Sequence, residues 1–400
     1  MDISLLFTTR IIRLFCYGFL SVILALYLSE AGFTESQIGL LFTFTLVGDA
    51  GITLWLTTSA DRFGRKRTLV VGALLMAGAG VGFVLTRNYI LLLIAAIIGV
   101  ISPGGNEIGP FLSVEQSSLS QLVPDEKRTG YFAWYNLVGS FATATGALTG
   151  GWLAQWLQNM GRSPFESYRT VLTGYAIGGF ILLVLFFNLS RAIEAVSRPD
   201  TTKRVLGLHR SHKIVFKLSS LFALDAFAGG LIVQSMFAYW FFVRFGVEAG
   251  TLGSIFFGAN ILAGVSALLA VRIAKRFGLI NTMVFTHIPS NILLILVPFM
   301  PNLPLAIGLL LLRFSISQMD VPTRQSYTMA VVAPDERSAA AGITAIARSV
   351  GASVSPVLTG LFFSIPALLS APFILSGGLK IVYDLLLFRE FRALKPPEEH

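Results

Sequence analysis

Charged side chains within long apolar stretches are the residues of this sequence best suited to chemistry. Of the 400 residues, 54% are hydrophobic and 13% are charged, so a charge inside an apolar stretch is unusual. An ionisable group in an apolar medium costs free energy and usually serves a function, such as binding a substrate or carrying a proton. Their signs nearly balance, so they favour neither a cationic nor an anionic substrate. The acids are Asp49, Glu107, Glu115, Asp225, Asp320 and Asp384, and the bases are Arg313, Arg324, Arg348 and Lys380.

Glu107 is the most informative of these acids because of its neighbours. Two prolines and three glycines surround it, which predicts a helix that is kinked or unwound at this point. Freed backbone carbonyls, with the side chains of Asn106 and Glu107, would suit a substrate or a proton. The alternative is a structural kink at which Glu107 pairs with Arg313. The segment is Ser102-Pro103-Gly104-Gly105-Asn106-Glu107-Ile108-Gly109-Pro110.

Asp225 and Asp320 are candidate proton carriers, because a carboxylate in a low-dielectric cavity can bind and release a proton. The alternative is that a neighbouring arginine neutralises each of them. Tyr17 is one of several aromatic residues suited to lining an amphipathic pocket, although such residues more often serve packing or lie at interfaces.

Three other polar residues are expected to be structural. Lys380 and Asp384 lie four residues apart, so we expect them to pair with each other, and we expect His287 to serve packing. The sequence shows neither metal-ligand spacing nor a nucleophile with a base and an orienting group, so no metal site and no enzymatic activity are predicted. A G-x-x-x-x-G-K-[ST] loop is also missing, so no ATP hydrolysis and no cofactor are predicted.

The elements that must position these residues are apolar runs of roughly 20 residues, each long enough to cross a hydrocarbon layer of about 30 Å. The runs are continuous rather than alternating, and lipid requires paired backbone amides, so they are helices. The first run lacks a small-residue cleavage site, so we expect an uncleaved helix. We predict an all-α membrane protein with spans at 5–29, 36–58, 68–86, 89–121, 130–157, 168–190, 213–243, 249–273, 281–300, 303–332, 339–363 and 367–389.

Most of the 30 lysines and arginines lie on the same side of these spans as the N-terminus. The positive-inside rule then places both termini in the cytoplasm, which requires an even number of spans, such as twelve. The net charge of +9 therefore indicates topology in a cell membrane (inner or plasma membrane) rather than binding to nucleic acid. We expect a monomer surrounded by membrane lipid.

The chain contains a duplicated pattern, which predicts two six-helix halves of parallel topology at 1–190 and 213–400. A basic cytoplasmic linker at 191–212 joins them, and such halves typically hold a substrate site between them near the bilayer midplane. Matches 214 residues apart are Gly32 with Gly246, Gly39 with Gly253, and Arg62-Phe63-Gly64 with Arg276-Phe277-Gly278. Matches 209 or 210 residues apart are Gln116-Ser117 with Gln325-Ser326, and Pro124-Asp125-Glu126 with Pro334-Asp335-Glu336.

The segment 61–67, Asp-Arg-Phe-Gly-Arg-Lys-Arg, resembles the signature loop G-x-x-x-D-R-x-G-R-R between helices 2 and 3 of the major facilitator superfamily. The spans, the basic linker and the degenerate second copy agree, so the resemblance covers essentially the whole chain. It implies two pseudo-symmetric six-helix bundles around a central cavity and secondary transport by alternating access. Thr57 stands where the superfamily has its first glycine, so helices 2 and 11 are expected to pack more loosely here.

The resemblance also implies a cytoplasmic gate that includes Gly64. Asp61 would cap the N-terminus of helix 11, Arg62 and Arg65 are forked donors suited to carboxylates, and Glu115 would complete the network. The alternative is that these charges are solvated and only set the topology.

The second half inverts the charges of this network. Lys275 replaces the acid, and Arg324 stands at the position that corresponds to Glu115. The second copy is therefore expected to be unable to form the same network.

We also predict an ion pair between the halves, from Asp49 on helix 2 to Arg348 on helix 11, which are neighbouring helices in similar transporters. At 1.5 Å per residue the two lie about 18 Å and about 15 Å above the level of the gate. The alternative is that each faces the cavity separately.

Helix 5 carries Gly146-Ala147-Leu148-Thr149-Gly150-Gly151, which resembles the antiporter signature G-P-x-x-G-G with alanine in place of proline. Close helix packing through small residues is the simpler explanation. We predict a proton-coupled transporter of a small organic solute, with export favoured. The alternatives are uptake by proton symport and a membrane sensor that keeps the fold without transport.

Overall fold

The computed structural model describes residues 2–107, 109–194, 210–333 and 336–394, and throughout these residues the ordered elements are helices. At 57–59, 61, 62, 125, 126, 129 and 338 the description covers the backbone alone. The predicted all-α fold class is confirmed.

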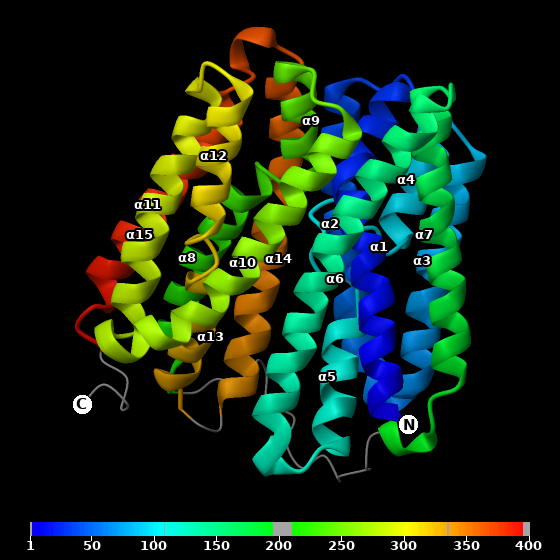
Figure 1. The fold of residues 1–400 in the computed structure, drawn as a ribbon. Helices are drawn as coiled ribbons and strands as arrows, with labels where there is room; N and C mark the ends of the chain where they lie inside the picture. The colour runs from blue at the N-terminus through cyan, green and yellow to red at the C-terminus, as the bar shows by residue number, and fades with distance from the viewer. Residues whose placement is uncertain (1, 108, 195–209, 334–335, 395–400) are drawn as a thin grey trace. The chain divides into compact units, whose positions relative to one another are not determined.

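Figure 1 shows the helices in chain order. Those of the N-terminal half are α1 (Asp2–Glu30), α2 (Glu35–Phe63), α3 (Arg65–Leu85), α4 (Tyr89–Ile98), α5 (Phe111–Leu122), α6 (Asp125–Asn159), α7 (Pro164–Phe187) and the 3-10 helix η1 (Arg191–Ile193). Those of the C-terminal half are α8 (His212–Gly230), α9 (Gln234–Phe245), α10 (Ala249–Phe277), α11 (Leu279–Leu296), η2 (Val297–Phe299), α12 (Leu303–Phe314), α13 (Asp320–Ala330), α14 (Arg337–Phe363), η4 (Pro366–Leu368) and α15 (Ala371–Phe391).

Three of the predicted spans are each divided into two helices. The span 89–121 contains α4 and α5, separated by the segment 99–110, whose described residues (99–107, 109 and 110) are not helical. This confirms the predicted unwinding around Glu107. Gly105 and Gly109 in this segment have φ angles of 69° and 77°, which side chains with a Cβ rarely adopt. The spans 213–243 and 303–332 are divided as well, at 231–233 and 315–319. Gly229 and Gly230 directly precede the first of these breaks, whereas the second contains neither glycine nor proline.

The duplicated Arg-Phe-Gly sequences form the same kind of joint in both halves. Gly64 joins α2 to α3 with a φ of 104°, and Gly278 joins α10 to α11 with a φ of 84°. Both glycines use a backbone conformation that is strained for other residues, so the repeated sequence has a repeated structural role.

Glycines also set the closest helix contacts. A Cβ added at Gly146 of α6 would lie 2.0 Å from the carbonyl oxygen of Phe15 of α1, and one at Gly351 of α14 would lie 2.3 Å from that of Ala223 of α8. Close backbone approach of this kind is typical of membrane helices with small residues at the contact. The antiporter-like sequence Gly146–Gly151 lies on α6, and its first glycine therefore serves packing between α1 and α6.

The described residues fall into two compact units. Within these residues, unit 1 comprises 2–194 with 233–260, apart from 108, and unit 2 comprises 210–232 with 261–394, apart from 334 and 335. In unit 1, α1 packs against α6, α7 and α9. In unit 2, α8 packs against α14 and α15, and α11 packs against α12, α13 and α15.

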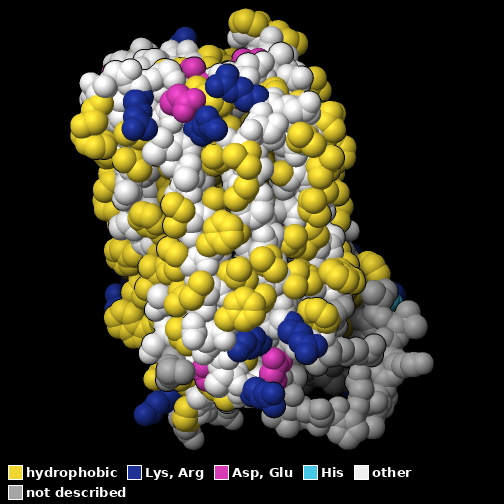
Figure 2. Space-filling model, turned by 90° about the vertical axis from the view of Figure 1, so that its right-hand side faces the viewer, with side chains coloured by type: hydrophobic (Ala, Val, Ile, Leu, Met, Phe, Trp, Pro, Cys, Tyr) yellow, Lys and Arg dark blue, Asp and Glu magenta, His cyan; other side chains and the backbone are white. Residues whose placement is uncertain are grey.

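The outer surface is suited to lipid. Within the described residues, nine helices are long and apolar enough to cross a membrane, and α4 and α12 are shorter apolar helices. Figure 2 shows one face on which hydrophobic side chains cover the middle, while lysine, arginine and acidic side chains gather towards its two ends. Exposed apolar surface on this scale is unfavourable in water and favourable in a bilayer, so the chain is a multi-pass membrane protein.

Candidate functional site

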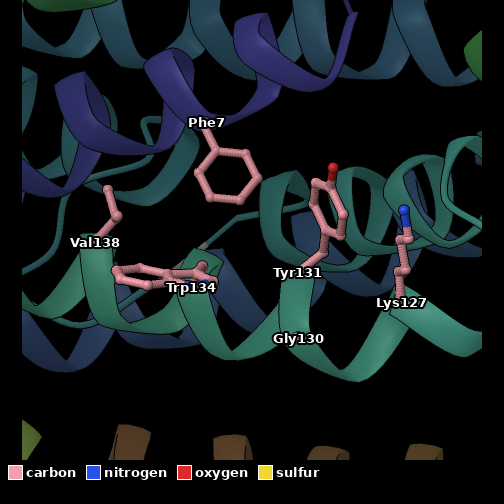
Figure 3. Close-up of a pocket in the computed structure, with 6 residues that line it drawn as sticks. All are labelled: Phe7, Lys127, Gly130, Tyr131, Trp134 and Val138. Carbon is pink, nitrogen blue, oxygen red and sulfur yellow. The ribbon is translucent and has the colours of Figure 1, made fainter.

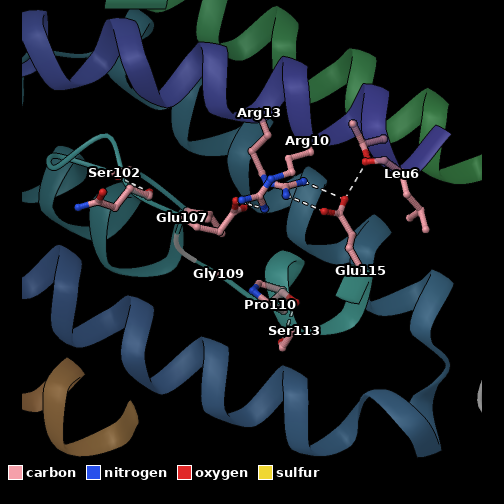
Figure 4. Close-up of polar contacts among 12 residues, drawn as sticks. Leu6, Arg10, Arg13, Ser102, Glu107, Gly109, Pro110, Ser113 and Glu115 are labelled. Atoms are coloured by element: carbon pink, nitrogen blue, oxygen red, sulfur yellow. Dashed lines mark hydrogen bonds and ion pairs between the residues drawn. The ribbon is translucent and has the colours of Figure 1, made fainter. Parts of the chain in front are cut away.

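Four charged side chains meet at the end of the segment 99–110 (Figure 4), and we call them the N-terminal charge cluster: Arg10 and Arg13 of α1, Glu107 and Glu115. Arg10 Nη1 lies 2.8 Å from Glu107 Oε2, and Arg13 Nε lies 2.6 Å from Glu107 Oε1. The two arginines share one face of α1 because they are three residues apart. The alternative that Glu107 pairs with Arg313 is wrong, since its carboxylate pairs with these two arginines.

Glu115 of α5 is completely buried and accepts hydrogen bonds from three residues. Arg13 donates through Nη1 and Nη2 over 2.9 and 2.7 Å, Thr9 donates its hydroxyl over 2.9 Å, and Tyr135 of α6 donates its phenol. Charged donors in this forked geometry make strong hydrogen bonds. Donors on α1 and α6 therefore surround its carboxylate, and its place in the predicted cytoplasmic gate stays a prediction.

The signature loop has a partner that the sequence did not indicate, Glu194 at the end of η1. Its carboxylate accepts the backbone N–H of Arg65 over 2.7 Å and that of Lys66 over 3.3 Å. An acid at this position stabilises the exposed amides and the positive end of α3. The side chain of Arg65 also donates to Gln121 Oε1 over 3.0 Å. The side chains of Asp61 and Arg62 lie outside the description, so the gate that includes them stays a prediction.

Asp49 and Arg348, which we predicted to pair across the halves, each have partners in their own unit instead. Asp49 Oδ1 accepts the backbone N–H of Gly109 over 2.7 Å and the Thr53 hydroxyl over 3.2 Å. Asp49 thus fixes α2 to the non-helical segment 99–110. Arg348 Nη1 lies 3.0 Å from Asp225 Oδ2.

Three other predicted site residues do not join the cluster. The Asn106 side chain is exposed, and its backbone carbonyl accepts the Ser102 hydroxyl over 2.8 Å. Tyr17 is completely buried, and its hydroxyl has no hydrogen-bond partner among the described residues. Arg313 stacks on the Phe314 ring at 5.0 Å, and its Nε is likewise without a partner in the described part of the chain.

Unit 2 contains a second set of buried charges, which we call the C-terminal charge cluster: Asp225, Asp320, Arg324, Arg348 and Lys380. Asp225 of α8 is its centre, since Lys380 Nζ lies 2.6 Å from Oδ1 while Arg324 Nη1 lies 3.2 Å from Oδ2. Arg324 also pairs with Asp320 over 2.7 Å. Neighbouring arginines therefore neutralise Asp225 and Asp320. This is the alternative that we gave to their being proton carriers.

The expected pair of Lys380 with Asp384 is wrong. Lys380 turns to Asp225, and Asp384 pairs through Oδ1 with Nδ1 of His287 over 2.9 Å. Asn291 donates to the other oxygen of Asp384 over 3.3 Å. His287 is therefore part of a polar network and not merely a packing residue.

A cavity of about 590 Å³ lies elsewhere in unit 1, between α1 and α6 (Figure 3). Phe7 of α1 faces Tyr131, Trp134 and Val138 of α6, and Lys127 stands at one end. Trp134 exposes 64% of its surface. Aromatic faces beside an ammonium group are suited to flat amphipathic molecules.

The residues that were missed could have been found by one signal. Arg10 and Arg13 lie inside the first apolar span, three residues apart, so buried acids had to meet them. His287 and Lys380 were named but assigned other roles, although both are polar residues inside apolar spans. Thr9 and Tyr135 carry no such signal, because their roles depend on how α1, α5 and α6 pack.

Sequence comparison places this architecture among known proteins. A family model described as the Major Facilitator Superfamily matches residues 6–356. The chain is 32% identical to the uncharacterized membrane protein YJR124C of Saccharomyces cerevisiae, over 96% of this chain and 93% of that protein. It is 22% identical to multidrug resistance protein 1 of Bacillus subtilis, over 76% and 75% of the two chains.

Solved structures share the fold at low sequence identity. A bacterial homolog of the human lysosomal transporter Spinster, in an inward-facing and occupied conformation, matches with a TM-score of 0.72 and 16% identity over 98% of this chain and 97% of that chain. A D-xylose-proton symporter matches with a TM-score of 0.74 and 13% identity over 100% and 99%. At this identity the similarity indicates the fold alone.

Proposed function

The chain belongs to the Major Facilitator Superfamily, and from this premise we propose that it is a proton-coupled secondary transporter that exports a small organic solute. Alternating access of two six-helix bundles, at 1–190 and 213–400 with the linker 191–212, is part of this proposal. So are twelve spans in an inner or plasma membrane, with both termini in the cytoplasm.

The N-terminal charge cluster is the observation that carries the proposal. Arg10 and Arg13 are almost completely buried with Glu107 and Glu115. Packed apolar residues would often be at least as stable as buried ion pairs, so stability alone does not explain four such charges. The four charges lie beside the segment 99–110, where the predicted span 89–121 is unwound, and such a position is typical of transporter sites.

A proton that binds Glu107 would have a defined effect on this cluster. Neutral Glu107 no longer attracts Arg10 and Arg13 as a carboxylate does. Arg13 keeps its two hydrogen bonds to Glu115, whereas Arg10 keeps only a 3.4 Å contact with Asn136 and its position 4.1 Å from the Tyr135 ring. Protonation would therefore free Arg10 and loosen α1 from the segment 99–110, which links proton binding to a change in structure.

Two observations support an organic solute and its export. The cavity lined by Phe7, Tyr131, Trp134 and Lys127 offers aromatic faces and a positive charge, which fits a flat amphipathic molecule. The relative from Bacillus subtilis carries the name multidrug resistance protein. Uptake by proton symport is the alternative, and the same cluster would serve it.

Flux measurements with purified protein in liposomes test the proposal. A pH gradient is imposed, and a panel of flat aromatic solutes of either charge is screened. Antiport predicts that a solute moves opposite to the protons, and symport predicts that it moves with them. If the gradient drives no solute in either direction, proton-coupled transport of this class is refuted and a non-transporting sensor is favoured.

A further inference from the structure

His287 and Asp384 form a buried polar pair between α11 and α15, apart from the N-terminal charge cluster. His287 Nδ1 lies 2.9 Å from Asp384 Oδ1, and their side chains are 6% and 1% exposed. Asn291, one helical turn after His287, donates to Asp384 Oδ2 over 3.3 Å. An imidazole and a carboxylate in hydrogen-bond contact can hold a proton between them.

The contact between α11 and α15 is polar beyond this pair. Ser290 Oγ and Asn291 Oδ1 of α11, and Ser376 Oγ of α15, are buried without a hydrogen-bond partner among the described residues. A Cβ at Gly377 would lie 2.8 Å from the carbonyl oxygen of Asn291, so the two helices approach closely here. Unsatisfied buried polar atoms are rare and call for an explanation.

The charges around His287 come from several helices. α15 contributes Lys380 and Asp384 and the ring of Tyr383, whose centre lies 6.2 Å from that of the imidazole. Lys380 pairs with Asp225 of α8, which also pairs with Arg324 and Arg348 on two further helices. The remaining buried or half-buried charged groups on the elements packed around this site are Asp320 and Arg324 of α13, Arg348 of α14, and Arg313 of α12.

The buried ion-paired residues of unit 2 are balanced in charge when His287 is neutral, and Arg313 is a further base outside these pairs. Among the described residues, the acids Asp225, Asp320 and Asp384 match the bases Arg324, Arg348 and Lys380 in number. Asp225 has three basic side chains within 3.2 Å. Within this set of described residues, His287 is the neutral base, so the pair of His287 with Asp384 can take up a further proton.

We propose that the His287–Asp384 pair is a proton-binding site of unit 2. The proton adds to the imidazole and leaves an imidazolium hydrogen-bonded to the Asp384 carboxylate. Because Lys380 lies one turn before Asp384 on α15 and contacts Asp225 on α8, the bound proton changes the charge balance at the contact between these helices. The role of this site in coupling rests on the proposed function, whereas proton binding itself does not.

The test is a residue-specific titration. Protein with ¹⁵N-labelled histidine rings is placed in lipid nanodiscs, and ring nitrogen shifts are followed from pH 5 to 8.5. The His287 signal, assigned with His287→Gln, should pass from the neutral to the protonated position in this range. At a fixed pH, Asp384→Asn should lower the ratio of protonated to neutral His287 about tenfold, because the neutral amide no longer stabilises the imidazolium.

His212, which is exposed at the start of α8, provides the internal control and should titrate alike in both proteins. A wild-type His287 signal that keeps one protonation state throughout would overturn the site without any need for a variant. The site would also be overturned if the folded Asp384→Asn variant showed an unchanged ratio of protonated to neutral His287. Titration of His287 without any proton-driven solute flux would retain this site and refute only the proposed function.

Discussion

Arg13 donates two hydrogen bonds, of 2.9 and 2.7 Å, to the two carboxylate oxygens of Glu115, and this buried pair joins α1 to α5. In the second half of the duplicated sequence, the corresponding pair has its acid and its base exchanged between the two helices. Arg324 of α13 stands at the position that corresponds to Glu115, and it pairs with Asp225 of α8, the helix that corresponds to α1. The inverted charge therefore does not abolish the contact in the second half, because the charge on the partner helix is inverted too.

We predict that Glu115→Gln destabilises the protein strongly. It leaves the buried N-terminal charge cluster with an excess positive charge, and breaking a buried pair on one side costs about 3–5 kcal/mol. The double variant Arg13→Met with Glu115→Leu restores the balance between Arg10 and Glu107, so it should unfold at a higher temperature than Glu115→Gln does. Thermal unfolding of purified protein compares them, and a double variant less stable than the single one would contradict this account.

The sequence was sufficient to predict the helical fold and the unwound segment, because both depend on local composition. Prolines and glycines around Glu107 disfavour a helix wherever the segment lies in the fold. Ion-pair partners were predicted less well. Lys380 and Asp384 are spaced to pair, yet Lys380 contacts Asp225 and Asp384 contacts His287. Helical spacing shows which side chains share a face, but the packing of α8 and α11 against α15 decides which acid each base meets.

We predict that Glu107→Gln abolishes or uncouples proton-driven flux while the protein stays folded. The amide is nearly isosteric with the carboxylate but cannot exchange a proton with the solvent at neutral pH. Flux in liposomes with and without a pH gradient separates loss of coupling from loss of binding. Glu390→Gln is the control, because Glu390 forms an exposed pair with Lys217 over 2.6 Å. Equal proton-driven flux in the two variants would remove Glu107 from the mechanism.

We predict that Gly146→Ala lowers the stability of unit 1, because the new Cβ would lie 2.0 Å from the carbonyl oxygen of Phe15. The clash is with backbone, so α1 and α6 must separate, at a cost of about 1–3 kcal/mol. Gly78→Ala on α3 is the matched control, since a Cβ there has no atom within 4 Å. Thermal unfolding should show a lower midpoint for Gly146→Ala alone, and equal midpoints would mean that the helix contact adjusts freely.

We predict that Glu194→Gln loosens the joint between α2 and α3. The Glu194 carboxylate accepts the N–H groups of Arg65 and Lys66, and loss of such a cap costs about 1 kcal/mol, which is about a fivefold change in an opening equilibrium. Thr68, buried one turn into α3, can report this opening as Thr68→Cys. The native Cys16 is buried, so it adds little labelling background.

The rate of thiol labelling at Thr68→Cys should rise about fivefold when Glu194→Gln is added. Asp61→Asn should also raise it if the gate predicted for the signature loop exists, since both changes remove an acid from the same joint. Glu390→Gln, which lies on α15, should leave the rate unchanged. A labelling rate that Glu194→Gln does not alter would mean that the joint is held by the side-chain contacts of Arg65 with Gln121 and not by the cap on α3.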